Sequence, residues 1–498
     1  MNAIFWNESP TLRTTTRSIG SYKIAHWIRK HGYDCQVIDF ISKMEEQYLY
    51  ANTVKFISKE TKILGISTTF LCNSSKTWPD GTVSRFPKHV VDVVKRIKFE
   101  FPHLKIVLGG YASDKLYMFG LPDATVMSYT NAVEDIFLEL LEHYLTGSEP
   151  PNSEIAKDYI GISDSSNLPV RPIYSSAKKP KYKIETDDFI WQDRDLIIPQ
   201  ETLPLDISRG CIFTCRFCQY PHLGKKKLDY IRGMEFLKNE IVSNYNKFGT
   251  TRYILLDDTF NDTVDKLKAF NDMTATLPFK ITYTTYLRAD LIDRFPDMAY
   301  MLKESGLFGA VHGLESLHPY ASNLMGKAWS GKKAKEFIPK LFHDIWKGEV
   351  AQELNFIIGL PKETKEDILS TVKWFEDNKL YSIFLNTLGV SKQGNKNNMW
   401  TISSEFERNA EKYGIMFDNN DVWYNETWTQ KEAAVLTNSL KQRRDLLKNE
   451  TWDIQNLLTI GYTREFILNT TLENFDLTDV RQYERNKFQT YMNLLTNL

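Results

Sequence analysis

Residues 1–150 alternate short apolar runs with amphipathic stretches, which is the pattern of helices covering a mainly parallel sheet. Apolar runs predict strands at Ala3–Trp6, Gln36–Phe40, Lys62–Ser67, Lys105–Leu108 and Ala124–Met127. Helical periodicity predicts helices at Ser18–His31, Val90–Phe99 and Val133–Tyr144. The predicted fold is α/β, a Rossmann-like doubly wound domain. Its ligand is expected beyond the carboxyl ends of the strands, at Ser67, Thr68, Gly109 and Gly110.

A second alternation of strand-like and helix-like segments fills residues 199–398. Strands are predicted at Leu203–Ser208, Tyr253–Asp257, Ile281–Leu287, Phe308–Leu314, Leu354–Gly359 and Ile383–Leu388. Helices are predicted at Met234–Tyr245, Val264–Thr274, Pro296–Glu304, Lys333–Trp346 and Lys365–Asn378. This number of parallel strands suits a partial barrel, whose site is expected on the loops at the carboxyl ends of the strands.

The remaining segments have a different composition. Residues 151–198 are expected to form a linker, because Ser, Pro, Asn and Lys are frequent from Thr146 to Lys183. Residues 399–498 are expected to be helical and to pack beside the open barrel, where they help define the substrate pocket. Helices are predicted there at Glu405–Tyr413, Gln430–Asn449 and Val480–Leu495, with Trp400, Trp423, Trp428 and Trp452 between them as core residues.

Composition narrows the class of protein. A chain of 498 residues exceeds what one core usually supports, so several domains are expected. The 62 Lys and Arg against 63 Asp and Glu give no charge that would favour nucleic acid or anionic lipid. No apolar run reaches the roughly 18 residues of a membrane span. The beginning of the chain lacks the features of a signal peptide, and the cysteine pattern is not a disulfide framework. These features predict a cytoplasmic protein.

Three of the five cysteines, Cys211, Cys215 and Cys218, lie on one predicted loop. Thiolates are soft ligands that select iron-sulfur clusters, zinc or copper(I). Three of them can hold three corners of a 4Fe-4S cluster, and the fourth iron then stays open to a small molecule. The alternative is a zinc site that His222 completes, although the Cys-x3-Cys spacing differs from that of a zinc knuckle.

The loop reads Cys-x3-Cys-x-Phe-Cys, with Phe217 in the aromatic position. It resembles the signature of the radical S-adenosylmethionine (SAM) superfamily. The resemblance implies a six-stranded partial barrel in which the cluster loop follows the first strand. It also implies that SAM binds the open iron and is cleaved reductively, giving methionine and a 5′-deoxyadenosyl radical that abstracts a substrate hydrogen. Flavodoxin or ferredoxin is the implied electron donor.

Short motifs that follow four later predicted strands extend this resemblance. They are Leu256–Asp262, Leu287–Asp290, Gly313–Ser316 with Met325–Lys327, and Ile358–Thr364. They are similar to the family's Asp-Asp-x-Phe, Arg-Ala-Asp, Gly-x-Glu-Ser and Gly-x-Pro-x-Glu-Thr segments. The resemblance implies that SAM lies near Phe217, Asp258, Arg288, Glu315, Ser316 and Gly359. A purely structural role remains open for some of them. Arg288 with Asp290 also suits an ion pair that fixes a loop, and an exposed Asp pair also suits a helix cap.

An α/β domain before such a barrel resembles the cobalamin-binding domain of the cobalamin-associated branch of the superfamily. Gly109-Gly110 matches a strand-ending glycine pair, and Glu134 fits the last acid of a Gly-Glu-x-Glu turn. The Asp-x-His-x-x-Gly motif is absent, so no histidine would bind cobalt from below. The glycine and first acid of the late turn are also absent from Ser128–Glu134. The alternative is a domain that binds nothing and covers the mouth of the barrel.

The cysteine count separates the related enzymes. Methylthiotransferases need a second three-cysteine cluster, which Cys35 and Cys72 cannot supply. The predicted function is therefore a radical SAM enzyme with one cluster, performing cobalamin-dependent methylation of an unactivated carbon. A cobalamin-free rearrangement, cyclisation or epimerisation is the alternative, and a non-catalytic binding protein with this fold is a third possibility. The expected substrate is a small molecule or a peptide.

Overall fold

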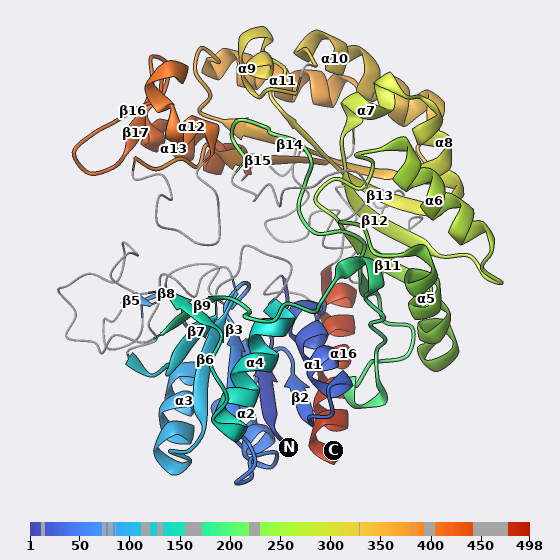
Figure 1. Cartoon of the computed structure of the whole chain (residues 1–498). Coiled ribbons are helices and arrows are strands. Elements are labelled where there is room, and N and C mark those ends of the chain that lie inside the picture. The colour runs from blue at the N-terminus through green and yellow to red at the C-terminus, as the bar shows by residue number, and fades with distance from the viewer. Residues whose placement is uncertain are drawn as a thin grey trace.

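The computed structural model describes residues 1–10, 15–71, 76–77, 83–84, 86–110, 120–126, 133–154, 172–218, 230–327, 329–380, 382–392, 404–441 and 477–498. The molecule has two α/β lobes, each built on one largely parallel sheet (Figure 1). The N-terminal lobe carries both chain ends, and the second lobe carries the predicted cluster loop.

The N-terminal lobe contains a seven-stranded sheet in the order β2-β1-β3-β6-β7-β9-β8. Its strands are β1 Ala3–Trp6, β2 Cys35–Ile38, β3 Ile63–Ser67, β6 Lys105–Gly109, β7 Ala124–Val126, β8 Asn152–Glu154 and β9 Ile173–Ser176. All neighbours pair in parallel except β8 and β9. The helices are α1 Gly20–Lys30, α2 Glu46–Val54, α3 Lys88–Glu100 and α4 Val133–Thr146, and a small hairpin joins β4 Lys76–Thr77 to β5 Val83–Ser84.

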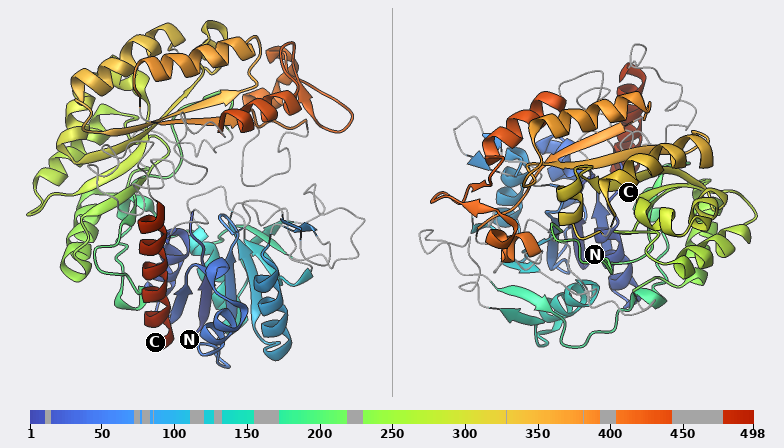
Figure 2. Two further views of the ribbon diagram at one scale, coloured as in Figure 1. Left: turned by 180° about the vertical axis from the view of Figure 1, so that it is seen from behind. Right: turned by 90° about the horizontal axis from the view of Figure 1, so that it is seen from above.

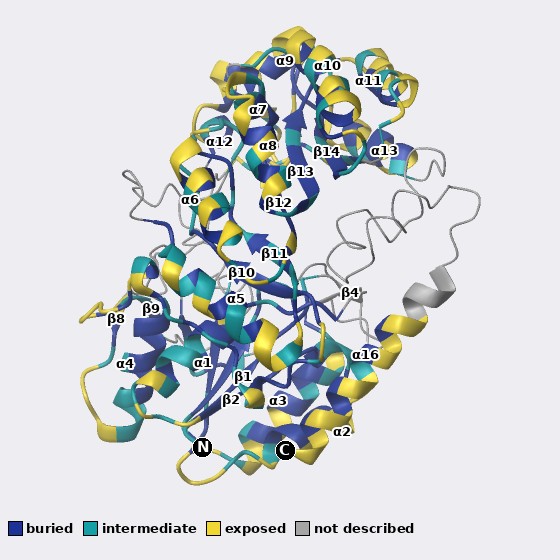
Figure 3. Ribbon diagram, turned by 90° about the vertical axis from the view of Figure 1, so that its right-hand side faces the viewer, coloured by how far each residue is buried: buried dark blue, intermediate teal, exposed yellow. Residues whose placement is uncertain are grey.

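Helices cover both faces of this sheet, which explains why its inner strands, such as β1 and β6, are largely apolar. On β1 the odd positions, such as Phe5, join the core under α1 and α4, where Phe5 meets Phe137 edge to face at 5.5 Å. The even positions, such as Trp6, join a second core under α2 and α3. Figure 3 shows this buried sheet between half-exposed helices.

The segment predicted to be a linker is partly a component of the fold. Strands β8 and β9 extend the N-terminal sheet, and Phe189 and Trp191 are fully buried farther along the same segment. The strands are short and carry Asn, Ser and Glu at the edge of the sheet. Such strands lack the apolar alternation from which a strand is predicted. Residues 155–171 lie outside the described part of the chain.

The second lobe is an open barrel of six parallel strands that follow one another in chain order. They are β10 Leu203–Asp206, β11 Arg252–Leu256, β12 Thr282–Leu287, β13 Leu307–Glu315, β14 Ala351–Ile358 and β15 Ser382–Thr387. The covering helices are α5 Met234–Phe248, α6 Val264–Ala275, α7 Ala289–Arg294, α8 Asp297–Glu304, α9 Pro319–Leu324, α10 Gly331–Lys340 and α11 Lys365–Asp377. They lie on the outer side of the curved sheet in both views of Figure 2. All six predicted strands are confirmed within a few residues.

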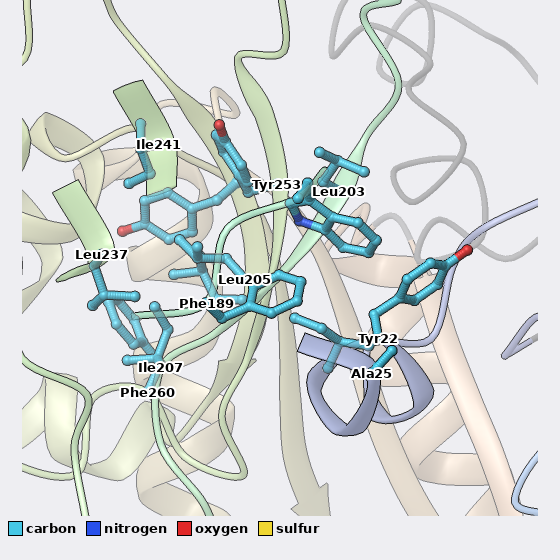
Figure 4. Packing of buried hydrophobic residues seen from close by; sticks show 14 of the residues in the cluster. Tyr22, Ala25, Phe189, Leu203, Leu205, Ile207, Leu237, Ile241, Tyr253 and Phe260 are labelled. Atoms are coloured by element: carbon cyan, nitrogen blue, oxygen red, sulfur yellow. The ribbon is translucent and has the colours of Figure 1, made fainter. Parts of the chain in front are cut away.

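One hydrophobic core joins the two lobes. Tyr22 of α1 packs against Trp191 of the connecting segment, with ring centroids 4.6 Å apart, and Trp191 meets Phe189 at 5.2 Å. Figure 4 shows this packing around Tyr22, Ala25, Phe189, Leu203, Leu205, Ile207, Leu237, Ile241, Tyr253 and Phe260. The first barrel strand therefore shares its buried side chains with the N-terminal lobe, and the shared core fixes the two lobes relative to each other.

The C-terminal region divides between the lobes. α12 Glu405–Arg408, the hairpin of β16 Met416–Phe417 and β17 Trp423–Tyr424, and α13 Gln430–Lys441 pack on the barrel core, as predicted. The last helix, α16 Leu477–Asn497, instead lies along the N-terminal lobe (Figure 1). Its residues Tyr491, Met492 and Leu495 join the core under α2 and α3, which corrects the expectation that the whole region flanks the barrel. Of the helices in the described ranges, none has the length and hydropathy that a membrane crossing needs.

Candidate functional site

The cysteine loop begins directly after β10, as predicted. Gly210 permits the turn into the loop with φ of +80°, a value that other residues rarely adopt. The amide of Phe213 donates to the Cys211 Sγ at 3.4 Å, and the amide of Cys218 donates to the Cys215 carbonyl at 3.0 Å. All three thiols are free of disulfide bonds and half-buried. The loop thus presents three available sulfur ligands on one short turn.

Residues from three later segments, the end of β11, the end of α9 and α12, hold this loop in place. The Cys211 Sγ lies 3.3 Å from the Thr259 Oγ1 after β11, and burial raises the pKa of the Cys211 thiol. The amide of Arg216 donates to the Met325 carbonyl at 3.1 Å, and its carbonyl accepts from the Phe406 amide of α12 at 3.0 Å. The cysteines therefore sit at the carboxyl ends of the barrel strands, where barrel sites are built.

The acidic segment after β11 separates into two kinds of carboxylate. Asp257 and Asp262 both pair with the buried Lys266 amine, at 3.0 and 2.7 Å, and Tyr230 donates to Asp262 as well. These two acids are committed to an internal ion cluster. Asp258 is half-buried and stands close enough to Cys211 to disfavour ionisation of its thiol. Of the predicted segment, Asp258 is thus the acid on the cysteine side.

Lys327 lies between Glu315 and the Phe217 ring. The Lys327 Nζ donates to the Glu315 Oε1 at 2.8 Å and to the Gly313 carbonyl at 2.7 Å, and it lies 5.5 Å from the centre of the Phe217 ring. Glu315 has φ of +66°, and the strand pairing shifts register between Gly313 and Glu315. A Cβ at Gly313 would come within 2.5 Å of the Glu315 Oε1, so a larger residue there would have to displace the end of the Glu315 side chain. This turn directs the acid toward the cysteine loop.

Ser316 and Glu363 tie the fourth strand end to the fifth. The Ser316 hydroxyl donates to the Glu363 Oε1 at 2.5 Å, and Glu363 is almost completely buried. Burial raises the pKa of this carboxyl to about 8. The hydroxyl of Ser316 also accepts from the His318 amide at 3.0 Å. Ser316 is thereby fixed by the protein before any ligand arrives.

Gly359 faces the C-terminal region. Its carbonyl accepts from the Asn425 amide group at 2.9 Å, and a Cβ at this position would come within 2.5 Å of the Trp423 ring. With φ of +108°, only glycine fits this turn without strain. The predicted role for Gly359, a backbone that faces SAM, stays a prediction, and its packing gives an internal reason for glycine.

Arg288 forms the ion pair with Asp290 that the sequence predicts as a structural role. Its Nη2 lies 2.6 Å from the Asp290 Oδ2, and its Nε donates to the Oδ1 at 3.0 Å. It also reaches the cysteine loop, because its Nη1 lies 3.9 Å from the Cys215 Sγ and its guanidinium carbon 4.0 Å from the centre of the Phe213 ring. The pair is therefore part of the site.

In the N-terminal lobe, β3 and β6 place the predicted ligand residues together. Ser67 lies opposite Gly109, and both the amide and the hydroxyl of Thr68 donate to the Gly109 carbonyl, at 2.8 and 3.0 Å. Gly110 has φ of +100°, and a Cβ there would come within 2.5 Å of the Thr69 Oγ1. The close approach that requires glycine is made by the chain itself.

An ion pair connects this lobe to the cysteine loop. The carboxylate of Glu134, at the start of α4, forms a two-point contact with Arg209, at 2.7 and 3.2 Å. Arg209 precedes Cys211 by two residues and also pairs with Asp206 at 3.3 Å. Glu134 is 1% exposed. Instead of facing a ligand, the acid matched to the late turn anchors the loop that carries the cysteines.

The chemistry of the donors fits an iron-sulfur cluster. Three thiols without disulfide bonds lie on one loop, and a cube distributes its three cysteines over three different irons. Among the residues that the structure describes, no three His, Cys, Asp or Glu side chains converge on one ion. The zinc alternative depends on His222, which lies outside the described residues, as does Cys72.

Three important side chains were not singled out from the sequence: Lys266, Glu363 and Arg209. Lys266 follows Asp262 by four residues at the start of α6, a spacing that brings two side chains together on a helix. Glu363 belongs to the Gly-x-Pro-x-Glu-Thr turn. Arg209 gives no local signal, because its partner Glu134 comes from the other lobe.

Comparison with known proteins gives one family match. The model of the radical SAM superfamily matches residues 205–375, which span the barrel from β10 to α11. Among curated proteins, an uncharacterized methyltransferase of Pyrococcus horikoshii is 24% identical over 379 residues, covering 72% of this chain and 73% of its own length. The similarity to this relative thus extends well beyond the barrel.

Solved structures resemble both lobes. TsrM from Kitasatospora setae, a radical SAM methyltransferase solved with tryptophan and a SAM analogue, has a TM-score of 0.63 at 12% identity and covers 98% of this chain and 99% of its own. OxsB, a cobalamin-dependent SAM radical enzyme, has a TM-score of 0.54 at 12% identity and covers 93% of this chain and 64% of its own. At these identities the likeness concerns the fold.

Proposed function

We propose that this chain, whose residues 205–375 match the radical SAM superfamily, is a cobalamin-dependent methyltransferase acting on an unactivated carbon. One observation carries the proposal. The barrel with the three-cysteine loop and the N-terminal lobe together resemble the fold of TsrM along 98% of this chain. A TsrM structure contains cobalamin and a 4Fe-4S cluster.

In this proposal Cys211, Cys215 and Cys218 hold the cluster. When bound, the cluster supplies the electron that cleaves SAM reductively, and cobalamin supplies a carrier for a methyl group. Flavodoxin or ferredoxin is the proposed electron donor. The free thiols suit a reducing compartment, and the cytoplasm is the proposed location.

The chain's own residues bind and orient SAM. Glu315, held by Lys327 beside Phe217, offers a carboxylate to the ammonium of the methionine part, and Asp258 offers a second one near Cys211. Glu363 already fixes the Ser316 hydroxyl. Ser316 therefore loses little conformational freedom when SAM binds beside it. At the opposing edge of the N-terminal lobe, Ser67, Thr68, Gly109 and Gly110 form the proposed corrinoid surface.

A second function, radical SAM chemistry without cobalamin, is favoured by two observations in the N-terminal lobe. Glu134 is occupied by Arg209, and the space in front of Gly110 is filled by Thr69. A lobe of this kind also suits a structural role in which it covers the barrel and excludes water. The substrate in either case is a small molecule or a peptide.

The test is anaerobic reconstitution with iron, sulfide and hydroxocobalamin, then incubation with SAM and an added chemical reductant, followed by assays of corrinoid per chain and of SAM products. The proposal expects corrinoid at about one per chain and both 5′-deoxyadenosine and S-adenosylhomocysteine as products, because one SAM is cleaved and another donates its methyl group. 5′-Deoxyadenosine without bound corrinoid or S-adenosylhomocysteine would select the cobalamin-free function. Neither product, with no cluster, would contradict both.

A further inference from the structure

Arg288 lies between the cysteine loop and a carboxylate. Its Nη1 contacts the Cys215 Sγ at 3.9 Å, while its Nε and Nη2 form a two-point contact with Asp290 at 3.0 and 2.6 Å. Both side chains are largely shielded from solvent, at 10% and 12% exposed. A charge beside a sulfur ligand in such a shielded position acts through a low effective dielectric.

The guanidinium is held rigidly in this position. The Phe213 ring covers it at 4.0 Å, and the Nη2 also donates to the Lys327 carbonyl at 3.4 Å. The backbone of Arg288 is fixed as well, since its amide donates to the Asn261 side chain at 2.8 Å and its carbonyl accepts from it at 2.9 Å. With Nε, Nη1 and Nη2 all engaged, the side chain is suited to act on the sulfur rather than to capture a ligand.

We propose that Arg288 and Asp290 set the reduction potential of the cluster, with opposite signs. The proposal rests on the proposed function, because it requires that Cys215 bind an iron. One electron passes from reduced flavodoxin or ferredoxin to the cluster, which gains one negative charge while the donor is oxidised. An N–H near a cluster sulfur and a nearby cation stabilise the reduced state and raise the potential, whereas a carboxylate lowers it.

Arg288 and Asp290 therefore shift the reduction potential of the cluster in opposite directions. Arg288 keeps the cluster within reach of a biological donor, and Asp290 neutralises part of the cation so that the reduced cluster remains a strong reductant. In this proposal the motif Leu287–Asp290 tunes the reduction potential of the cluster and does not contact SAM. Arg288 is a positioning and tuning residue, since it acts through Cys215 and not on the substrate.

The experiment is a redox titration, monitored by electron paramagnetic resonance (EPR), of reconstituted wild type, Arg288→Gln, Arg288→Lys and Asp290→Asn. At a fixed solution potential, Arg288→Gln is expected to lower the ratio of reduced to oxidised cluster by about tenfold, which corresponds to about 59 mV for one electron. Asp290→Asn is expected to raise it, and Arg288→Lys to fall between wild type and Arg288→Gln. Arg294→Gln is the matched control, because this arginine is exposed at the end of α7.

Opposite shifts in Arg288→Gln and Asp290→Asn, with Arg294→Gln unchanged, support the proposal. Unchanged potentials, or shifts of one sign, in variants that hold a full cluster would overturn it and leave the proposed function intact. If Arg288→Gln binds no iron, Asp290→Asn and Arg288→Lys decide the question by the same criteria. A wild type that binds no cluster would overturn this inference and the proposed function together.

Discussion

At the scale of single residues, burial at the barrel mouth forces charged groups into pairs. Lys266 pairs with Asp257 and Asp262, and Lys327 pairs with Glu315. The strand-end motifs identify the acids, but the pairs form between segments whose approach is set by the fold. The sequence therefore predicted Glu315 as a site residue but did not predict its pairing with Lys327, although both residues lie in strand-end motifs.

Glu315→Gln tests the SAM role of this acid. The variant keeps the size of the side chain but removes the charge that holds Lys327, so SAM affinity is expected to fall about tenfold or more while iron content stays unchanged. Equilibrium binding of SAM to the reconstituted protein measures it. Glu336→Gln is the matched control, because Glu336 is exposed on α10. Equal affinities in both variants would remove Glu315 from the SAM site.

Glu363→Gln tests the buried carboxyl through the pH dependence of stability. The pKa of Glu363 is raised to about 8 in the folded protein, so the folded state binds this proton more tightly than the unfolded chain does. Its contribution to the free energy of unfolding is complete below about pH 4.3, the unfolded pKa, and is lost as the pH rises through about 8. The variant carries no charge and should remove this loss.

Denaturant unfolding at pH 5 and pH 8 measures the effect. Relative to wild type, Glu363→Gln should gain roughly 3 to 4 kcal/mol more at pH 8 than at pH 5. Identical changes in free energy of unfolding at the two pH values would mean that Glu363 titrates normally in the folded protein.

At the scale of elements, sequence patterns predicted the strands and helices that have a buried apolar face. They did not predict the strands at the edge of the N-terminal sheet. All six barrel strands were predicted, because each packs one apolar face against helices. The sequence predicts a linker where β8 and β9 form, because edge strands rich in Ser and Asn carry little hydrophobic signal. The helix α2 was not predicted, since its buried residues Leu49, Asn52 and Thr53 are mostly polar.

Gly110→Ala tests the junction of β3 and β6. Its Cβ would collide with Thr69, so the free energy of unfolding should fall by about 2 to 4 kcal/mol, and any corrinoid should be lost while iron is retained. Gly147→Ala is the matched control, with φ of +75° and open space around it, and it should cost about 1 kcal/mol. Thermal unfolding with corrinoid assay measures both variants. Equal losses would show that the contact with Thr69 is unimportant.

Tyr491→Ala tests the docking of α16 on the N-terminal lobe. The Tyr491 hydroxyl accepts from the Asp39 amide at 2.7 Å, and its ring meets Phe40 at 5.1 Å. The variant should lose about 3 to 5 kcal/mol in free energy of unfolding. Tyr483→Ala on the same helix, where the side chain is 43% exposed, should lose under about 1 kcal/mol. Similar losses in a denaturant titration would argue against the docked helix.

At the scale of the whole molecule, buried ions as well as the shared core hold the two lobes in register. Lys23 of α1 pairs with Asp206 of β10 at 2.8 Å and with Asp187 of the connecting segment, which Arg232 also approaches at 3.6 Å. Separating the lobes would leave these charges without partners, which is costly inside a protein. The lobes are therefore expected to unfold together.

This cohesion explains where the sequence prediction of domains fell short. Boundaries were placed where composition changes, but Trp191 and α16 cross them to pack in the N-terminal lobe. Such contacts join residues far apart in the chain, so neither local periodicity nor composition contains them. The cysteine loop, in contrast, was predictable, because all three of its cysteines lie within one short segment of the sequence.

EPR of the anaerobically reconstituted and reduced protein, before and after SAM is added, tests whether the chain holds a cluster with one iron open to SAM. We expect about four irons per chain and a spectrum that changes with SAM, because three thiolates leave one iron without a protein ligand. Replacing Cys211, Cys215 and Cys218 by Ala should abolish the signal. Stoichiometric zinc without iron, or a cluster whose spectrum does not respond to SAM, would contradict the account.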